Sequence, residues 1–549
     1  MYHASFAFRD DLLLFAEVGA TLLAALVVLW RPRRLERPLR RAWRRLAAVP
    51  ARRAVWASGV VALLASLASM LWLAFPVPIT TDEFGYLLIG DTVAHGRLTN
   101  PMPAVPAAFE AVHTLVRPSY STKYPPAHGT WLALGQLLGH PGLGVCLAAG
   151  VLGAAACWFL QGWLPPPWPL LGAALLSLRV GVGSYWGQSY WGGATTALGG
   201  LLLYGALPRL YGRRARLAWL PIAGGVFLLA NSRPLEGAVA ALPAALLVGI
   251  ALLRHRRRWW PAAGALTLAL AAGALATAAY NRAVTGDALR LPYQLHIATS
   301  GMDAASPYVA PPPPVRYSSP VLAAHLAKEF PRPRTWGEAL AKGGSSFARM
   351  TYFVGGLPLL ACFVLALCPL PRGRRHTPWK AFALLCCVLP AALHSVTAWW
   401  GPHYSAAATG PLLLLAMFGM REASATPWRG RRLGPWLAAA ALAVRVPLTV
   451  AELPAFRPDP GTTSRFAGQL ERRFATSGRR GLVVVDDRLR AKREWVINRA
   501  DLDRAPLLWI QDLGPGVTRE VAAAYAPREV YRLVPGAGIG APPRLIRAW

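Results

Sequence analysis

The sequence predicts an all-α polytopic membrane protein with a small α/β domain at its carboxyl end, and three observations support this prediction. The chain has 549 residues, of which 54% are hydrophobic and 15% are charged, whereas a soluble domain carries roughly 25% charged residues. The apolar residues come in blocks of about 16–22, the length of helix that crosses roughly 30 Å of hydrocarbon. From residue 455 onward these blocks give way to short apolar runs of strand length.

Twelve of the apolar blocks are expected to form membrane helices, which together make a domain of residues 1–454. A further apolar run at 128–139 is too short to span comfortably, so we expect a re-entrant or interfacial helix there. The expected membrane helices lie near residues 11–30, 54–75, 143–160, 168–180, 193–209, 217–231, 236–253, 261–280, 351–369, 379–397, 405–420 and 434–451.

The arginines predict the orientation of the bundle. The formal net charge is +33, and the arginines cluster in alternate short loops, with ten of them in residues 31–53 alone. Because cytoplasmic loops carry the excess of Arg and Lys, the amino terminus and the carboxyl domain are expected to be extracytoplasmic. This distribution accounts for the charge without nucleic acid as a partner. The 31–53 run is either a topology determinant or a clamp for anionic membrane lipids.

Three regions are then expected outside the membrane, namely loops at 76–142 and 281–350 and a carboxyl domain at 455–549. The second loop contains Pro311–Pro314, which should be extended. The Ala-, Arg-, Gly- and Pro-rich composition is typical of a bacterial protein, so the expected location is the inner (plasma) membrane.

The carboxyl domain is expected to contain a helix over 464–477 and a small parallel sheet. Its expected strands are GLVVVDD (481–487), PLLWIQD (506–512) and EVYRLVP (529–535). The alternative is a tail that packs on the membrane domain without a sheet of its own.

An acidic pair, Asp82-Glu83, follows the second expected membrane helix and opens the first outer loop. Carboxylates beside a bilayer are costly, so they usually have a function or a partner. Adjacent helical residues point about 100° apart, so we expect divided roles. One carboxylate would take a proton from an acceptor hydroxyl, and the other would orient a substrate or hold a divalent cation. The alternative is a solvated helix start with Thr81 or Asp82 as its cap.

The same loop supplies candidate residues for binding a lipid phosphate. Lys123 precedes a Tyr-Pro-Pro turn that begins at Tyr124 and leads into the short apolar helix. A compact cation at the membrane interface suits a phosphate. Ordinary snorkelling of the lysine is an equally good interpretation. Weaker candidates in this loop are Arg97, His113, Arg117 and His128.

Three further turns on the same side are candidates for substrate binding. SYWGQSYWGG (184–193) contains Trp186, Tyr190 and Trp191, whose rings either stack on a sugar or form an interfacial aromatic belt. NSRPLEG (231–237) contains Arg233, which either pairs with Glu236 or binds the leaving phosphate. WWGPHYS (399–405) contributes His403 and Tyr404.

These motifs resemble the GT-C fold glycosyltransferases, and most of all the polyprenyl-phosphate-sugar-dependent branch with the protein O-mannosyltransferases and the lipid A aminoarabinose transferase. The resemblance rests on the acidic pair after an early membrane helix, on DEFGYLLIGDTVAHGRLTNP (82–101), on KYPP (123–126), and on the YWGQSYWGG and HY turns. A set of bacterial membrane proteins placed in that superfamily is similar in these motifs. The specific part covers roughly residues 54–210.

The resemblance implies an inverting transfer of a sugar from a polyprenyl-phosphate donor to an extracytoplasmic lipid, glycan or protein acceptor. Asp82 would match the catalytic acidic residue of the family, and Lys123 a cation near the lipid phosphate. Members differ in metal use, so a divalent cation stays open as a cofactor. The α/β tail departs from the better known members and leaves the acceptor open.

Two other classes of function stay open. A transporter or lipid flippase would place charged residues inside the spans, where the sequence shows few: Glu17 and Arg179 lie near span edges, and Arg445 is the main exception. A membrane scaffold without catalytic activity, whose tail binds a partner, is the second alternative.

Overall fold

The structure is a computed structural model, and the statements below concern the residues that it describes. Most of the expected extended segment Pro311–Pro314, and also Trp399, lie outside these residues. The described stretches are 11–30, 33–211, 217–254, 256–301, 314–328, 335–367, 377–397, 400–425, 433–459, 462–490, 494–536 and 542–548.

Each of the twelve expected membrane segments contains a helix, which confirms the predicted helical membrane fold. Within the described residues, eight helices are long and apolar enough to cross a membrane, judged by length and composition. The twelve helices are α2 (Asp11–Trp30), α4 (Ala51–Leu73), α7 (Pro141–Gln161), α8 (Trp168–Leu176), α10 (Gly193–Ala206), α11 (Trp219–Ala230), α12 (Pro234–Arg254), α13 (Arg256–Thr285), α16 (Trp336–Leu367), α17 (Thr377–His394), α18 (Thr409–Ala425) and α19 (Gly434–Glu452).

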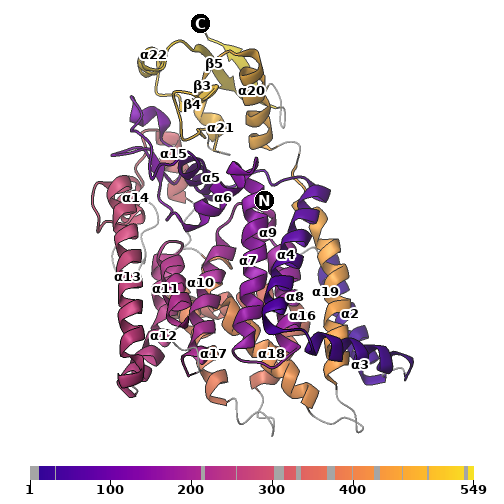
Figure 1. Cartoon of the computed structure of the whole chain (residues 1–549). Helices are drawn as coiled ribbons and strands as arrows, with labels where there is room; N and C mark the ends of the chain where they lie inside the picture. The colour runs from indigo at the N-terminus through magenta and orange to yellow at the C-terminus, as the bar shows by residue number, and fades with distance from the viewer. Residues whose placement is uncertain are drawn as a thin grey trace.

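The two ends of the bundle differ in what covers them (Figure 1). One end carries α5 (Thr81–Ala94), α6 (Ala127–Leu137), α14 (Pro292–Ser300), α15 (Pro320–Lys328) and the carboxyl domain, and we call it the domain end. The opposite end carries α3 (Arg33–Ala47), and we call it the arginine end. The short apolar run expected at 128–139 is the helix α6.

Two breaks interrupt the membrane helices. The end of α8 continues as a π-helical turn over Ser177–Val182, which leads into the short helix α9 (Tyr185–Gln188). Helix α16 is broken at Gly356, whose φ of 59° lies in the left-handed region that favours glycine. π-Turns and breaks of this kind often mark functional segments.

The carboxyl domain contains the predicted parallel strands. Strands β3 (Gly481–Val485), β4 (Leu507–Gln511) and β5 (Glu529–Val534) are parallel, and the sequence analysis missed β6 (Arg544–Arg547), which pairs antiparallel with β5. The sheet order is β4-β3-β5-β6. Three helices complete the domain, namely α20 (Thr463–Ser477), α21 (Asp487–Arg490) and α22 (Pro515–Ala524).

The carboxyl domain shares a hydrophobic core with the first long loop of the membrane domain. Leu88 of α5, Phe109 and Tyr120 pack in one cluster with Leu482 and Ile510 of the sheet. Polar contacts reinforce this packing, because the backbone N–H of Ala500 donates to Asp91 of α5 at 2.7 Å. The domain boundary near residue 455 stays a prediction, and the shared core joins the two predicted domains.

Candidate active site at the domain end

The first turn of α5 presents Asp82 and Glu83 to different surroundings, as the 100° spacing predicted. Thr80 caps the helix, and the Glu83 carboxylate accepts from the Thr80 backbone N–H at 3.1 Å. The cap is therefore Thr80, and the alternative of Thr81 or Asp82 as the cap is wrong. The half-buried Asp82 accepts a hydrogen bond from the hydroxyl of Tyr124.

Glu83 is fully buried and joins two segments that lie far apart in the sequence. One carboxylate oxygen accepts from the backbone N–H of Ile79 at 2.9 Å, and the other accepts from the backbone N–H of Tyr190 at 3.1 Å. Burial raises the pKa of Glu83, and the hydrogen bonds from Ile79, Tyr190 and Thr80 oppose that rise. Glu83 thus fixes the start of α5 to the aromatic turn at 184–193.

Three tyrosine rings surround the Asp82 side of α5. The rings of Tyr86 and Tyr124 lie 4.5 Å apart between centroids, and those of Tyr124 and Tyr293 lie 5.9 Å apart. The buried ammonium of Lys123 lies 5.2 Å from the Tyr124 ring centroid and 5.7 Å from that of Tyr293. The candidate carboxylate and the candidate cation therefore contact the same ring system.

A second buried cation, Arg233, reaches these tyrosines from the turn before α12. Its guanidinium carbon lies 4.2 Å from the centroid of the Tyr404 ring, and its guanidinium hydrogen bonds to the Tyr86 side chain. Burial raises the pKa of Tyr86 to about 12, although the charge of Arg233 acts in the opposite direction. The sequence proposed Glu236 as the partner of Arg233, and the structure adds Tyr86 and Tyr404 to the surroundings of Arg233.

His113 also lies beside the Tyr124 ring. Its ring centroid is 5.8 Å from that of Tyr124 and 5.6 Å from that of His296 on α14. The φ of His113 is 68°, an uncommon backbone conformation for a residue with a side chain, and such conformations cluster at functional sites. Arg117, in contrast with Lys123 and Arg233, is exposed.

The aromatic turns at 184–193 and 400–405 pack against each other. The hydroxyl of Tyr185 lies 2.8 Å from Nδ1 of His403, and the Trp191 and His403 rings lie 4.3 Å apart between centroids. His403 in turn contacts the ring of Tyr404 at 4.6 Å. Trp186, Tyr190 and Trp191 are all buried, which fits a part in holding this end together better than an open platform for a sugar.

His128 of α6 connects the same turn to helix α10. Its Nε2 lies 2.9 Å from the carbonyl oxygen of Tyr190, and its Nδ1 lies 3.0 Å from the hydroxyl of Thr195. Burial lowers the pKa of His128 to about 4, and the hydrogen bond with Tyr190 opposes that shift. The imidazole is therefore neutral near pH 7.

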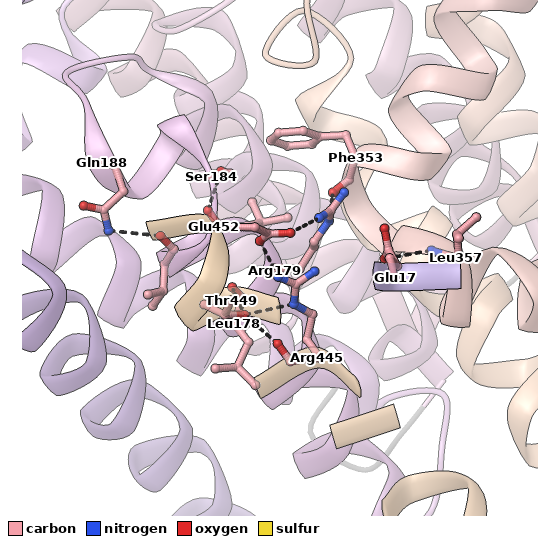
Figure 2. Close-up of polar contacts among 12 residues, drawn as sticks. Glu17, Leu178, Arg179, Ser184, Gln188, Phe353, Leu357, Arg445, Thr449 and Glu452 are labelled. Atoms are coloured by element: carbon pink, nitrogen blue, oxygen red, sulfur yellow. Dashed lines mark hydrogen bonds and ion pairs between the residues drawn. The ribbon is translucent and has the colours of Figure 1, made fainter. Parts of the chain in front are cut away.

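A network of charged residues inside the helix bundle supports the aromatic turn at 184–193 (Figure 2). Arg179, in the π-helical turn, donates to Glu452 of α19 at 3.1 Å and to the carbonyl of Phe353 at 3.0 Å. Arg445 binds the other oxygen of Glu452, so this carboxylate lies between two arginines. The Phe353 ring also packs on Trp186 at 4.9 Å between centroids.

Glu17 of α2 supports the same region through the break in α16. Its carboxylate accepts from the backbone N–H of Leu357 at 3.1 Å and from the Tyr352 hydroxyl at 2.7 Å. Another buried pair, Lys380 with Glu422 at 2.6 Å, joins α17 to α18. The membrane helices therefore contain more charged residues than the sequence analysis recognised. Glu452 and Glu422 lie where α19 and α18 continue beyond the expected spans, and Lys380 lies inside the expected span 379–397.

The sequence analysis missed Tyr86, Tyr185, Tyr293 and His296 as members of this site. Tyr86 follows Asp82 by four residues, which places both on one helix face. This spacing could have identified Tyr86 from the sequence. Tyr293 and His296 come from α14, which only the tertiary fold brings to Tyr124 and His113. Among the described residues, His, Cys, Asp and Glu form no group of three or more that is able to hold a metal ion.

The fold and the site together define a polytopic helical membrane protein with a carboxylate, two buried cations and several tyrosines gathered at one end. No family model matches the sequence, and no curated protein matches it. The solved structures include ArnT from Cupriavidus metallidurans in the apo state, to which the chain is similar with a TM-score of 0.45 and 14% identity, over 77% of this chain and 81% of that chain. A similarity of this extent assigns no residue role and no substrate to the present chain.

Proposed function

We propose that this protein is a membrane glycosyltransferase that moves a sugar from a polyprenyl-phosphate donor to an acceptor hydroxyl, with inversion at the sugar carbon. One observation carries the proposal. At the end of a membrane bundle, the Asp82 carboxylate and the buried cation Lys123 both contact the Tyr124 side chain. The buried cation Arg233 contacts Tyr86, whose ring packs on that of Tyr124. A base beside fixed cations is what the transfer of a sugar from a phosphate requires.

The proposed reaction divides the work between these groups. Asp82 takes the proton of the acceptor hydroxyl, whose oxygen forms the new bond to the sugar carbon as the bond from that carbon to the phosphate oxygen breaks. The leaving polyprenyl phosphate keeps the electron pair of the broken bond, and Arg233 and Lys123 stabilise its charge. The Tyr124 hydroxyl orients the Asp82 carboxylate.

Glu83 has a supporting part in this proposal. Its carboxylate accepts hydrogen bonds from the backbone N–H groups of Ile79, Thr80 and Tyr190, and its side chain is fully buried. A carboxylate held in this way positions Asp82 and the aromatic turn and does not meet the acceptor itself.

The test is sugar transfer by the purified protein in lipid, with a panel of radiolabelled polyprenyl-phosphate sugars. Asp82→Asn should lower the turnover rate on the order of 10²–10⁴-fold, as expected for loss of a general base. Arg233→Lys should lower it on the order of 10²–10³-fold, because a lysine does not reproduce the fork of the guanidinium. The matched control is Asp503→Asn on the exposed surface of the carboxyl domain. Transfer that is equal in Asp82→Asn and in the control would refute the assignment of the base.

The charged network of Arg179, Arg445 and Glu452 favours one alternative, a transporter or lipid flippase, because charged residues inside membrane helices often mark a transport pathway. The same purified protein in sealed liposomes separates the two functions. Movement of labelled lipid or solute that persists in Asp82→Asn and stops in Glu452→Gln would support transport instead of transfer.

A further inference from the structure

Helix α3 combines a strongly basic face with an apolar face. It has seven arginines and one acidic residue, Glu36, which leaves a net charge of +6 on 15 residues. At 100° per residue, Leu35, Leu39, Trp43 and Leu46 fall on one side of the helix. The arginines fall on the other side, and they are Arg33, Arg34, Arg37, Arg40, Arg41, Arg44 and Arg45.

The ring of Trp43 packs this helix against the rest of the protein. Trp43 meets the ring of Trp168 at the start of α8 edge-on, with 4.9 Å between centroids. A Cβ atom on Gly434, the first residue of α19, would lie 3.4 Å from the Trp43 ring, so the start of α19 also lies against it. Much of the remaining apolar side is open, because Leu35 and Leu46 are both 47% exposed, while Leu39 is half-buried.

The connections of α3 keep it at the boundary of the membrane. Helix α2 ends at Trp30 and α4 begins at Ala51, and both are candidate membrane spans. A 15-residue helix is about 22 Å long, so most of the chain between the spans is used by α3 itself. Figure 1 shows α3 running across the direction of α2 and α4 at the arginine end. An amphipathic helix in this position places its apolar side in the acyl boundary and its basic side among headgroups.

We propose that the arginine face of α3 is a binding surface for the headgroups of anionic phospholipids in the membrane leaflet at the arginine end. Charge complementarity selects this occupant, because clustered basic residues on an interfacial helix attract anionic lipids. Arginine suits a phosphate group in particular, since the guanidinium donates two parallel hydrogen bonds to it. The exposed Leu35 and Leu46 select a lipid surface over an acidic protein or a nucleic acid, because only the lipid offers acyl chains beside its phosphates.

The experiment measures which lipids the full-length protein retains and binds. The protein is purified from membranes containing phosphatidylglycerol and phosphatidylcholine in known proportion, and the bound lipids are counted by native mass spectrometry. Short-chain phosphatidylglycerol is then titrated onto delipidated protein at low and at high salt. The test variant is Arg37→Gln/Arg41→Gln/Arg44→Gln, and the same three positions changed to lysine keep the charge. Arg472→Gln/Arg473→Gln/Arg480→Gln removes three exposed arginines from the carboxyl domain as the matched control.

The expected result is an excess of phosphatidylglycerol over phosphatidylcholine on the wild-type protein. The glutamine variant should bind phosphatidylglycerol on the order of a hundredfold more weakly at low salt, with the lysine variant much closer to wild type and the control unchanged. The lysine variant also keeps the charges that set topology, so its binding is measured on a protein in the native orientation. Protease accessibility of the carboxyl domain in sealed vesicles shows whether the glutamine variant has the same orientation. The proposal is overturned if wild type shows no preference for phosphatidylglycerol, or if the glutamine variant and the control lose equal amounts of it. None of these outcomes depends on sugar transfer.

Discussion

Asp82 and Glu83 are neighbours in the chain but differ in what they contact. Asp82 is half-buried and accepts a hydrogen bond from the hydroxyl of Tyr124. Glu83 is surrounded by donors from its own cap and from Tyr190. This difference gives a direct way to separate the proposed base from the residue that positions it.

Glu83→Gln is expected to destabilise the fold, because the new amide NH₂ would face backbone N–H groups where the carboxylate now accepts from them. The loss should be about 1–3 kcal/mol for each buried donor left without an acceptor. The measurement is thermal unfolding of the purified protein in detergent. Asp82→Asn is the comparison and should unfold close to the wild-type temperature. If Glu83→Gln is as stable as Asp82→Asn, the positioning role is wrong.

His128 predicts how stability changes with pH. Its pKa is lowered by burial from 6.5 to about 4, so between these values the unfolded chain binds a proton that the folded protein does not. Stability should therefore fall as the pH is lowered from 6.5 to 4, with a contribution of up to about 3 kcal/mol from this residue. The unfolding temperature of His128→Asn should fall less over the same range, because its amide does not titrate. Equal slopes for the two proteins would contradict this assignment.

At the level of single residues, the sequence identified both carboxylates, both buried cations and the turns that meet at the site. It did so because acidic and basic residues beside a membrane are rare enough to stand out. It did not reveal that the aromatic residues of 184–193 are buried, or that Tyr293 packs on Tyr124. These depend on contacts between segments more than 100 residues apart, which the local pattern does not contain.

Among the elements, the π-helical turn at Ser177–Val182 has the most direct bearing on the site. It presents Arg179 to Glu452 and to the backbone carbonyls beside the break in α16, and the aromatic turn begins directly after it. The position of that turn is thus set by charge-assisted hydrogen bonds inside the bundle. Hydropathy located these helices in the sequence. It did not predict the pairing of Arg179 with Glu452, which lie 273 positions apart.

Arg179→Lys is expected to loosen the aromatic turn. A lysine keeps the charge but has no planar fork with which to bind the carboxylate and both carbonyls at once, so the protein should lose about 1–3 kcal/mol for each buried acceptor left without a donor. Hydrogen exchange over residues 184–191 should become faster. Lys380→Ala breaks a second buried pair between membrane helices, with Glu422, and should lower stability without a selective effect on 184–191. Equal exchange in that segment for wild type and Arg179→Lys would refute the supporting role.

At the scale of the whole molecule, a buried arginine and apolar packing both attach the carboxyl domain to the first long loop of the membrane domain. The side chain of Arg490 is fully buried, and it donates to the carbonyl of Glu110 at 2.9 Å and also to Gln511. The sequence predicted the strands of this domain from their apolar runs. It did not predict where they dock, because the partner surface lies in a loop near the other end of the chain.

Arg490→Ala is expected to weaken this attachment, because the Glu110 carbonyl and the Gln511 side chain lose a buried, charged donor. The loss should be about 3–5 kcal/mol, with faster proteolysis in the segment that joins α19 to α20. Arg488→Ala, two residues away, removes an arginine that is 74% exposed and should change stability by less than about 1 kcal/mol. If the two variants behave alike in unfolding and in limited proteolysis, the buried contact does not hold the domain.

The shared core of the carboxyl domain and the first loop also has a consequence for biosynthesis. Asp91 precedes its partner Ala500 by 409 residues, and ribosomes add about 5–20 residues per second. Leu88, Phe109 and Tyr120 therefore emerge roughly 20–80 s before the sheet that covers them exists. During that interval the nascent protein exposes an apolar surface beside its proposed base, and the surface is completed only when the carboxyl domain has been translated.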